Sequence, residues 1–504
     1  MSKEAISSVM SADEDSELAA FVLDECERRL RAYDAQPRDV REHYETEIEV
    51  LSGGYAWRQL FELVQNAADA IGEAGDTEGR IHIALEAGHI VAANTGAPLD
   101  KGGIVALLNA RSSSKRAGQI GRFGIGFKSL LKLGGAVELV SRTVGLRFDP
   151  DWCRRTIRER LGLDSDAIAP SMRLAQPLEP ETSASPLASA PYAWATTVVT
   201  AEVADPSVRE RIVAEMAAFP AEFLLFLDAD VELVLDVAGG PLRIITRRSE
   251  GEVMVVGDEH TETRWRLFQR RVAIEDEAAR ADAMHLQARD EVPLAWAVPL
   301  GGREAAGMFW AFFPTQSQTL AAGILNAPWK LNSDRTNVIQ GAWNEALMKE
   351  AASLIADHIG DLATPDDPGA PVAALPRQLE RQDELAASLV RPLWDLLVDR
   401  PIVADGDSGL RCGRELVRHP IEDGELLRRW RDLAGSDRAR ALVHPACQSG
   451  RRRAARLDAL ARETAARSPV GKATALPVIA EAAWLEQAAS AEPAPARDGT
   501  CQRL

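Results

Sequence analysis

Hydrophobic and polar residues recur with two different periods along the first third of the chain. Apolar residues return at helical spacing in "SELAAFVLDECERRL" and again in "WRQLFELVQNAADAI", so both stretches are predicted to be amphipathic helices. In "GRIHIALEAGHIVAANTG" apolar and polar residues alternate on either side of "EAGH", which predicts a β-hairpin. A short helix at "GGIVALLNA" and strands in "AVELVSRTVGLRFD" and "ATTVVTAEV" follow. We therefore expect a domain of mixed α and β structure.

The pattern continues beyond residue 220 and then changes. A second region of strands ends in the helix "WNEALMKEAASLIADHI". The proline-rich stretch "LATPDDPGAPVAALP" is typical of a linker, and the Ala-, Arg- and Leu-rich remainder is predicted to be mostly helical. We expect an N-terminal helical segment, two successive α/β domains, a linker and a helical C-terminal region, at residues 1–45, 46–220, 221–361, 362–376 and 377–504.

Composition narrows the classes of protein that fit. Of the 504 residues 46% are hydrophobic, which is enough for packed cores, and the net charge is −18. So acidic a chain argues against broad nucleic-acid binding. The five cysteines lie far apart, so neither a zinc cluster nor a disulfide framework is indicated. The N-terminus does not resemble a signal peptide, and no run of about 18 uncharged apolar residues occurs. We expect a cytoplasmic protein without membrane attachment.

The helix containing "ELVQNAADA" carries the first candidate chemistry. Glu62, Asn66 and Asp69 fall within about 60° of one another on one helical face, opposite a face of leucine, valine and alanine. This polar face is either solvated or directed into a pocket. In a pocket, the Asn66 carboxamide oxygen would suit Mg²⁺, and a carboxylate could orient or deprotonate a water that attacks a metal-bound triphosphate.

Two turn-forming stretches follow this helix. "VAANTGAPL" places Asn94 and Gly96 at the end of a predicted strand, which by itself indicates only a turn. "SSSKRAGQIGRFGIGFKS" has glycines whose backbone N–H groups could surround phosphate, ahead of a helix expected from Phe127, with Lys115 and Lys128 adding positive charge. The glycine spacing matches neither the Walker A motif nor the Rossmann fingerprint.

Taken together in this order, "ELVQNAADA", "NTG" and "SSSK…GRFGIGFKS" resemble the GHKL superfamily of ATPases. The similarity is greatest to its sacsin-like, heat-shock-chaperone-like branch and covers roughly residues 45–350. The resemblance implies an α+β protein, with a two-layer Bergerat sandwich that binds ATP and Mg²⁺. An α/β middle-type domain and a mostly helical region would follow it.

The resemblance implies roles for the matching residues. Glu62 matches the general base for ATP hydrolysis, and Asn66 matches the Mg²⁺ ligand. Asn94 departs from the family's Asp-x-Gly, whose aspartate accepts a hydrogen bond from the adenine amino group, although an Asn carbonyl oxygen can also accept. The other matches are Asp69 and Gly96 at the base pocket, Gly121, Gly124, Gly126 and Phe127 in the phosphate-binding segment, Lys115 in the lid, and Thr196 or Thr197 behind the adenine.

A fourth stretch, "LNSDRTNVIQ", resembles the middle-domain loop that sends an arginine to the γ-phosphate in the chaperone. On that interpretation Arg335 stabilises charge on the transferred phosphate. The alternative is an ion pair of Arg335 with Asp334 or Asp228, and Lys330 is a rival for the same role.

The expected function is a Mg²⁺-dependent ATPase of chaperone or conformational-switch type, whose lid at 97–120 closes over ATP. Its partners would be a protein client or partner subunit, or a second copy in a homodimer, in bacterial stress or anti-phage defence. The rival hypotheses are a nucleotide-sensing scaffold with little or no hydrolysis and a MutL-like DNA-processing ATPase. The basic stretch around "SGRRRAARLDALAR" is either a solvated helix face or a nucleic-acid patch.

Overall fold

The structure, a computed structural model, describes most of the chain as two compact units. The described residues are 3–52, 59–86, 88–109, 127, 129–179, 187, 190–283, 291–301, 307–332, 335–377, 383–419 and 442–467. The first unit comprises Met1–Arg264 with Asn332–Thr336, and the second comprises Trp265–Leu331 with Asn337–Leu504. None of the described helices combines the length and apolarity that crossing a membrane requires. Helices and strands occur in both units, so the predicted α+β class is confirmed at that level.

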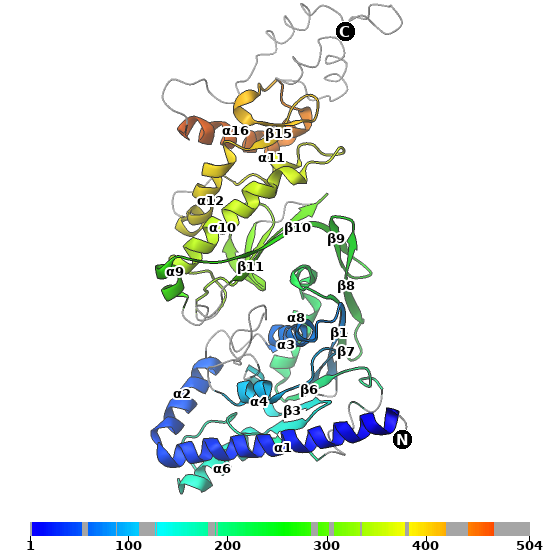
Figure 1. Ribbon diagram of the computed structural model, residues 1–504, viewed down its shortest axis with the longest axis vertical. Helices are drawn as coiled ribbons and strands as arrows, with labels where there is room; N and C mark the ends of the chain where they lie inside the picture. Colours follow the sequence, from blue (N-terminus) through cyan, green and yellow to red (C-terminus); the bar gives the residue numbers. More distant parts are fainter. Residues whose placement is uncertain are drawn as a thin grey trace, which may run out of the picture. The chain divides into compact units, whose positions relative to one another are not determined.

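The first unit begins with two helices, α1 (Lys3–Ala35) and α2 (Arg38–Ser52). The long helix α1 contacts α4 (Lys101–Leu108) and α6 (Pro150–Leu161), and Figure 1 shows it running past both. Val22 and Tyr33 of α1 are almost fully buried, and Tyr33 packs edge-on against His43 of α2. The N-terminal helices are therefore part of the packed first unit.

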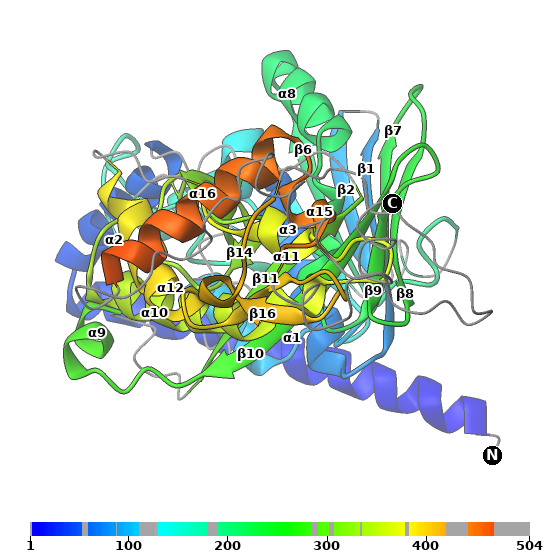
Figure 2. The same ribbon diagram turned by 90° about the horizontal axis from the view of Figure 1, so that it is seen from above.

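A mixed sheet forms the centre of the first unit. Its strand order is β9-β8-β7-β1-β2-β6-β3-β4-β5. β1 and β7 are parallel, whereas β1–β2, β2–β6, β6–β3 and β3–β4 are antiparallel, and β1, β7, β8 and β9 can be followed side by side in Figure 2. The strands are β1 (Glu78–Glu86), β2 (His89–Asn94), β3 (Gly134–Ser141), β4 (Gly145–Phe148), β5 (Gln176–Pro177), β6 (Thr197–Val203), β7 (Asp230–Val237), β8 (Arg243–Glu250) and β9 (Val253–Gly257).

The predicted hairpin is confirmed as β1 and β2, which pair from Ile81 with Asn94 to Glu86 with His89. Gly88 in its turn has φ of 81°, a conformation that glycine adopts without steric cost. The prediction of a helix beginning at Phe127 is wrong for Ser129–Leu133, because these residues form the short 3₁₀ helix η2. Gly134 follows with φ of 94° and opens β3, so the chain turns into a strand instead of continuing as a helix.

Helix α3 (Gln59–Ala74) lies against the sheet and contacts β1 and β2. Leu60, Val64 and Ile71 of α3 are almost completely buried, because apolar residues at helical spacing face the strands. α8 (Pro206–Ala217) contacts both α3 and β6. The helix that was expected to carry the functional residues is thus fixed to the strands that end in the "NTG" turn.

The first unit extends beyond residue 220, where a domain boundary was expected. After the 3₁₀ turn η3 (Ala221–Phe226), β7 pairs in parallel with β1, and Ile81 lies opposite Leu233. The unit continues through β8 and β9 to Arg264. Parallel pairing joins segments far apart in the sequence, and local periodicity carries no sign of it.

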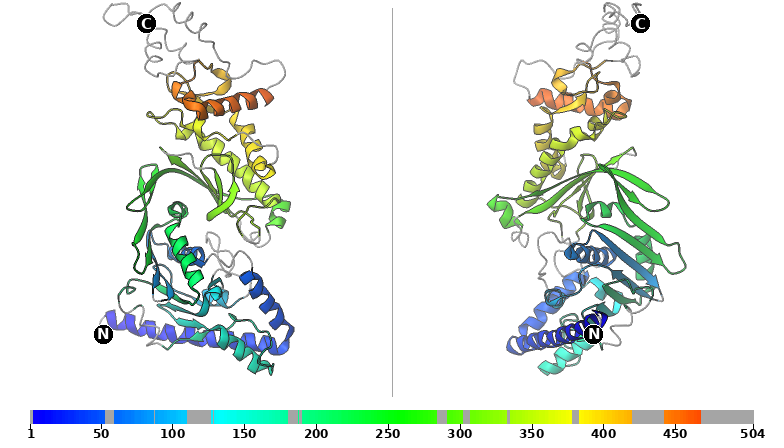
Figure 3. Two further views of the ribbon diagram at one scale, coloured as in Figure 1. Left: turned by 180° about the vertical axis from the view of Figure 1, so that it is seen from behind. Right: turned by 45° about the vertical axis from the view of Figure 1, so that its right-hand side comes forward.

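The second unit combines a sheet with two long helices. The strand order is β10-β11-β14-β12-β13, with β12 and β14 parallel and the β11–β14 and β12–β13 pairs antiparallel. The helices α10 (Ala342–His358) and α12 (Glu384–Leu397) lie side by side, as the yellow-green and yellow ribbons of Figure 3 show. The strands are β10 (Glu262–Val272), β11 (Val292–Leu300), β12 (Met308–Ala311), β13 (Phe313–Gln318) and β14 (Ile324–Asn326).

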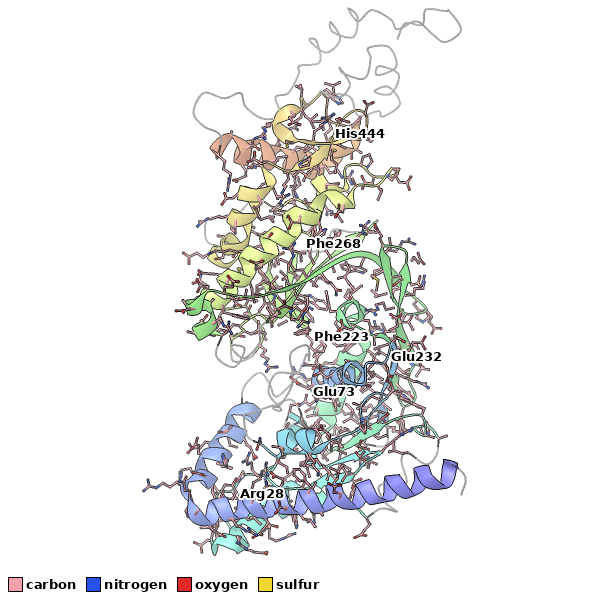
Figure 4. All side chains as sticks on the ribbon, viewed as in Figure 1. Arg28, Glu73, Phe223, Glu232, Phe268 and His444 are labelled. Atoms are coloured by element: carbon pink, nitrogen blue, oxygen red, sulfur yellow. The ribbon has the colours of Figure 1, made fainter. Side chains whose placement is uncertain are left out.

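Aromatic residues form much of the core between this sheet and α10. Trp296, Phe309 and Trp329 are fully buried. Phe268, labelled in Figure 4, stacks on Trp296 with 5.4 Å between ring centroids and on His358 with 4.8 Å. Such pairs stabilise a core beyond the apolar area that they bury.

Residues 362–376 do not form the expected linker. They contain α11 (Ala370–Ala374), and Val372 and Leu375 are completely buried in the core of the second unit. Pro371 lies in the first turn of α11, where proline is compatible with a helix, so the prolines start a helix here and do not mark a mobile connection.

The described part of the C-terminal region is mostly helical, as predicted, but it also contains a short hairpin. The remaining elements of the second unit are α9 (Glu277–Asp282), η5 (Ile359–Leu362), β15 (Pro401–Ala404), β16 (Leu410–Cys412), η6 (Gly413–Glu415), α15 (Pro445–Gln448) and α16 (Gly450–Arg467).

Candidate functional site

A cavity of about 310 Å³ lies in the first unit beside α3. It brings five residues singled out from the sequence around one space: Asn66, Asp69, Asn94, Phe127 and Thr197. The other lining residues are Leu63, Ala67, Ala70, Glu73, Ala92, Ala97, Pro98, Leu99, Asp100, Gly102, Gly103, Ala106, Leu107, Leu139 and Val199. Most of these side chains are apolar, and the polar ones come from α3, from the end of β2, from Asp100 ahead of α4 and from the start of β6.

Helix α3 supplies one wall of the cavity. Asn66, Asp69 and Glu73 share a helical face, and Glu73 is labelled on α3 in Figure 4. Glu62 and Asp69 are each only 6% exposed. Glu62 and Asp69 on the polar face of α3 are therefore not part of a solvated surface, which was one of the two interpretations, whereas Glu73 is exposed. Burial of carboxylates requires compensating partners.

Asn94 ends β2 at the cavity and is 7% exposed. Its backbone oxygen accepts a hydrogen bond from the Thr196 N–H at 2.8 Å, and its side-chain Nδ2 donates to the Thr95 carbonyl at 2.6 Å. The amide nitrogen thus has a partner within the turn, which fixes the orientation of the carboxamide. The Asn94 Oδ1 can accept a further hydrogen bond from a group in the cavity.

Gly96 holds the turn after β2 against α3. Its φ is 110°, and a Cβ at this position would lie 2.5 Å from the backbone carbon and oxygen of Ala70. The next residue, Ala97, donates its N–H to the Ala70 carbonyl at 2.8 Å. Only glycine allows this approach, so the third residue of "NTG" fixes the cavity wall that begins at Ala97.

A buried hydroxyl cluster supports the opposite wall. Thr197, and not its neighbour Thr196, lines the cavity. The Thr197 Oγ1 lies 3.3 Å from the Oγ of Ser141, which is 3% exposed and accepts a hydrogen bond from the Leu99 N–H at 2.9 Å. Ser141 therefore connects the start of β6 to the segment that leads into α4. The sequence did not single it out, because only the pairing of Ser141 with Thr197 between β3 and β6 brings them together.

Phe127 is the described residue of the expected phosphate-binding segment. It is 4% exposed, lines the cavity and packs edge-on against Phe148 with 5.0 Å between ring centroids. The remaining members of that segment, Lys115, Gly121, Gly124 and Gly126, lie outside the described residues.

Arg335 contacts Glu62 within the first unit. The Arg335 Nη1 lies 3.4 Å from the Glu62 Oε1, and the side chains are 17% and 8% exposed. Burial lowers the pKa of the Arg335 guanidinium to about 9, so it stays protonated near neutral pH. Arg335 has φ of 55°, an unfavourable conformation for a residue other than glycine. Glu62, one helical turn before Asn66, is thus a described partner of Arg335, and Asp334 lies outside the described residues.

Lys330, the rival cation, has a partner of its own in the second unit. Its Nζ donates to the backbone oxygen of Asp282 at 2.9 Å and to the Asp282 carboxylate. The hydrogen bond from Lys330 is also the main reason why the pKa of Asp282 is lowered. Lys330 therefore has a structural role beside α9.

The charged residues among the described part of the cavity lining are all acidic. Asp69, Glu73 and Asp100 line it, and the described lining residues include no lysine or arginine. The Asp100 Oδ1 accepts the N–H of Gly103 at 2.7 Å and so caps α4. The described residues contain no group of three or more His, Cys, Asp and Glu side chains placed to hold a metal ion.

Comparisons with known proteins give little further information. No protein-family model matches the chain, and no curated protein matches it. A solved structure, the N-terminal domain of a DNA repair protein, aligns with a TM-score of 0.32 at 10% identity, over 60% of this chain and 94% of that one. A similarity of this degree assigns neither a fold family nor a function to the chain.

Proposed function

We propose that the first unit binds ATP with Mg²⁺ as a Bergerat-type domain of the GHKL superfamily, closest to its sacsin-like branch, and hydrolyses it. The observation that carries the proposal is that Asn66, Asp69, Asn94 and Phe127, selected from sequence motifs, line one cavity. A sandwich of α3 and α8 on the mixed sheet is compatible with that fold.

The apolar side of the cavity suits a purine ring. Ala67, Leu139 and Val199 offer apolar contacts, and Asn94 presents its Oδ1 as a hydrogen-bond acceptor. The exocyclic amino group of adenine is the matching donor. Thr197, held by Ser141, adds a hydroxyl at the same wall.

The residues of α3 fit a bound magnesium ion. Mg²⁺ binds one or two protein oxygens and takes its other ligands from water and phosphate, and the Asn66 carboxamide oxygen would be such a protein contact. The acidic lining also fits this assignment, because Mg²⁺ offsets the repulsion between a triphosphate and Asp69 or Glu73. The ion would supply electrostatic stabilisation of the phosphates.

The ion pair between Glu62 and Arg335 supplies the groups for hydrolysis. Glu62 would orient the attacking water and accept its proton, whereas Arg335 would stabilise charge on the transferred phosphate. In the structure the two side chains neutralise each other, which avoids an uncompensated buried charge. Arg335 must shift toward the phosphate before Glu62 becomes an effective base.

The same ion pair favours the second candidate, a nucleotide-sensing scaffold. If Arg335 remains on Glu62 when ATP is bound, the carboxylate stays a weak base and turnover is slow or absent. Binding, but not hydrolysis, would then drive a conformational response. In either case we propose a chaperone-like or switch-like protein of the cytoplasm that acts on a protein client or partner, and a homodimer is compatible with that role.

ATP turnover by the wild type, Glu62→Gln and Arg335→Gln distinguishes the two candidates. An ATPase requires that both variants still bind ATP and that Glu62→Gln lowers kcat by about 100-fold or more, the contribution typical of a general base. Lys330→Gln is the matched control and should keep the wild-type kcat. If wild type binds ATP and turns it over no faster than Glu62→Gln, the scaffold is the correct function.

A further inference from the structure

Helix α4 forms one wall of the cavity beside α3, although its own sequence makes it a weak helix. The residues of α4 that line the cavity are Gly102, Gly103, Ala106 and Leu107. The helix has only eight residues, and two of them are glycines, which are among the least favourable residues in a helix. Isolated helices shorter than about 12 residues are marginal in water. Contacts with the rest of the first unit must therefore hold α4 in place.

The start and the inner face of α4 are anchored to the core of the first unit. Leu99, just before the helix, donates its N–H to the Ser141 Oγ at 2.9 Å and accepts a hydrogen bond from the Thr143 Oγ1 at 2.7 Å. Ile104 and Leu108 are completely buried. These contacts fix where α4 begins, and its C-terminal end is held from the other side, by α1.

Arg29 of α1 holds the end of α4 through a buried hydrogen bond. Its Nη2 donates to the Oδ1 of Asn109 at 3.0 Å, and Asn109 is the residue that caps the C-terminus of α4. Its Nη1 donates to the backbone oxygen of Glu25 at 2.9 Å and to the Glu25 carboxylate at 2.6 Å. The side chains of Arg29 and Glu25 are each only 10% exposed. Glu25 thus orients the guanidinium that binds Asn109, and a charged donor makes this hydrogen bond a strong one.

A second link between α1 and α4 is exposed to solvent. The Lys101 Nζ pairs with the Glu17 carboxylate and lies 5.7 Å from the centroid of the Phe21 ring. The side chains of Lys101 and Glu17 are 51% and 67% exposed, and exposed ion pairs contribute little to stability. The link through Arg29 is therefore the stronger of the two.

We propose that Arg29 is a positioning residue for the nucleotide site. Through Asn109 it keeps the end of α4 in place, so that Ala106 and Leu107 remain in the wall that the nucleotide meets. The inference rests on the proposed function, because it concerns the affinity of the same cavity. If the nucleotide binds best when α4 is held, bound nucleotide must in turn stabilise the contact of α4 with α1. Helix α1 would thus act as a regulatory element, and a partner that draws it away would release the nucleotide.

Calorimetric titration of the full chain with ATP and Mg²⁺ tests the proposal on both sides of the contact. Arg29→Gln and Asn109→Ala should each weaken ATP binding by about 10-fold, because only a fraction of the molecules then has the wall of α4 in place. Asn109→Asp keeps an oxygen acceptor for Arg29 and should retain the affinity of the wild type. Arg31→Gln is the matched control, because Arg31 is an exposed arginine of α1 whose described ion pair, with Glu27, lies within the same helix. It should stay within about 2-fold of wild type.

Two further measurements separate positioning from general stability. Steady-state turnover should show a raised KM for ATP in Arg29→Gln with an unchanged kcat, since Glu62 and Arg335 are not altered. Hydrogen exchange should show that ATP slows exchange of the α1 amides around Arg29 in the wild type, and that this protection is lost in Asn109→Ala. A loss of stability alone would produce neither pattern.

Thermal unfolding identifies a variant that fails to fold, and the two Asn109 variants then decide the outcome, since they leave the buried pair of Arg29 with Glu25 intact. The proposal is overturned if Asn109→Ala binds ATP as tightly as Arg31→Gln does, or if Asn109→Asp binds as weakly as Asn109→Ala. It is also overturned if ATP leaves the exchange of α1 unchanged in the wild type. If the wild type itself does not bind ATP, the proposed function is wrong, and the role of Arg29 in it is excluded as well.

Discussion

At the scale of single residues, the candidate site depends on two positions, Asn94 and Gly96, at which few other side chains could keep the same contacts. Asn94 lines the cavity with its Nδ2 bonded to the Thr95 carbonyl, and Gly96 has no space for a Cβ against Ala70. Both positions were selected from the three letters "NTG". Their individual roles follow only from the contacts with Thr95 and α3, which the sequence does not contain.

Asn94 should make the site selective for adenine. Inosine triphosphate has no exocyclic amino donor, so we expect wild type to bind ATP about 10-fold more tightly, the effect of one hydrogen bond to a buried acceptor. Asn94→Ala should bind the two nucleotides equally and more weakly. Fluorescence-detected titrations of both proteins with both nucleotides measure this, and a preference for ATP that survives in Asn94→Ala would exclude Asn94 as the acceptor.

Gly96→Ala should disturb the fold itself. The added Cβ meets the Ala70 backbone, and the positive φ adds strain, so the free energy of unfolding should fall by about 2–4 kcal/mol. Gly88→Ala is the matched control, because Gly88 has φ of 81° but nothing within 4 Å of the added Cβ. The free energy of unfolding of Gly88→Ala, measured by urea unfolding, should fall by only about 1–2 kcal/mol. Equal losses would mean that the contact with α3 contributes nothing.

At the scale of elements, periodicity predicted α3, the β1–β2 hairpin, α4 and β6, since each has a clear pattern of apolar residues. It did not predict how strands far apart in the sequence pair. The pairing of β1 with β7 extends the first unit beyond residue 220, and the pairing of β3 with β6 places Ser141 beside Thr197. The interpretation of 362–376 as a linker relied on its prolines and missed the burial of Val372 and Leu375.

Ser141→Ala should loosen the contact between the start of β6 and the segment leading into α4. The Leu99 N–H loses its acceptor and Thr197 loses a hydroxyl partner, so stability should fall by about 1–2 kcal/mol and ATP should bind more weakly. Ser388→Ala removes an exposed hydroxyl in the second unit and is the control. If Ser141→Ala keeps the stability and the ATP affinity of the wild type, this hydroxyl cluster does not support the cavity.

Asp258 should make the first unit sensitive to acid. Its hydrogen bond from the Arg243 Nε, at 2.8 Å, is the main reason why its pKa falls from 3.8 to about 2. The stabilisation is complete above about pH 4 and disappears as the pH falls through about 2, because protonated Asp258 no longer pairs with Arg243. Asp258→Asn should therefore be less stable than wild type at pH 6, with a difference in urea unfolding that shrinks toward pH 2. A difference that is constant with pH would contradict this account.

At the scale of the whole molecule, each of the two units contains a cavity with a different chemical character. The first unit contains an acidic and apolar cavity whose described lining does not include Glu62, although Glu62, paired with Arg335, lies on the same helix α3. The second unit contains an apolar cavity lined in part by arginines of α16. The net charge of −18 predicted the absence of a broad basic surface but could not reveal a local one. Local charge depends on which elements the fold brings together, as with α11 and α16.

Binding of ATP in the presence of Mg²⁺ tests the central claim most directly. Calorimetric titration of wild type should give a single site in the first unit, and Asn66→Ala should weaken binding by about 10-fold or more, because the amide oxygen that contacts the metal is lost. Gln36→Ala removes an exposed amide between α1 and α2 and should bind as wild type does. If wild type does not bind ATP, or if Asn66→Ala binds it as tightly as Gln36→Ala, the cavity beside α3 is not a nucleotide site.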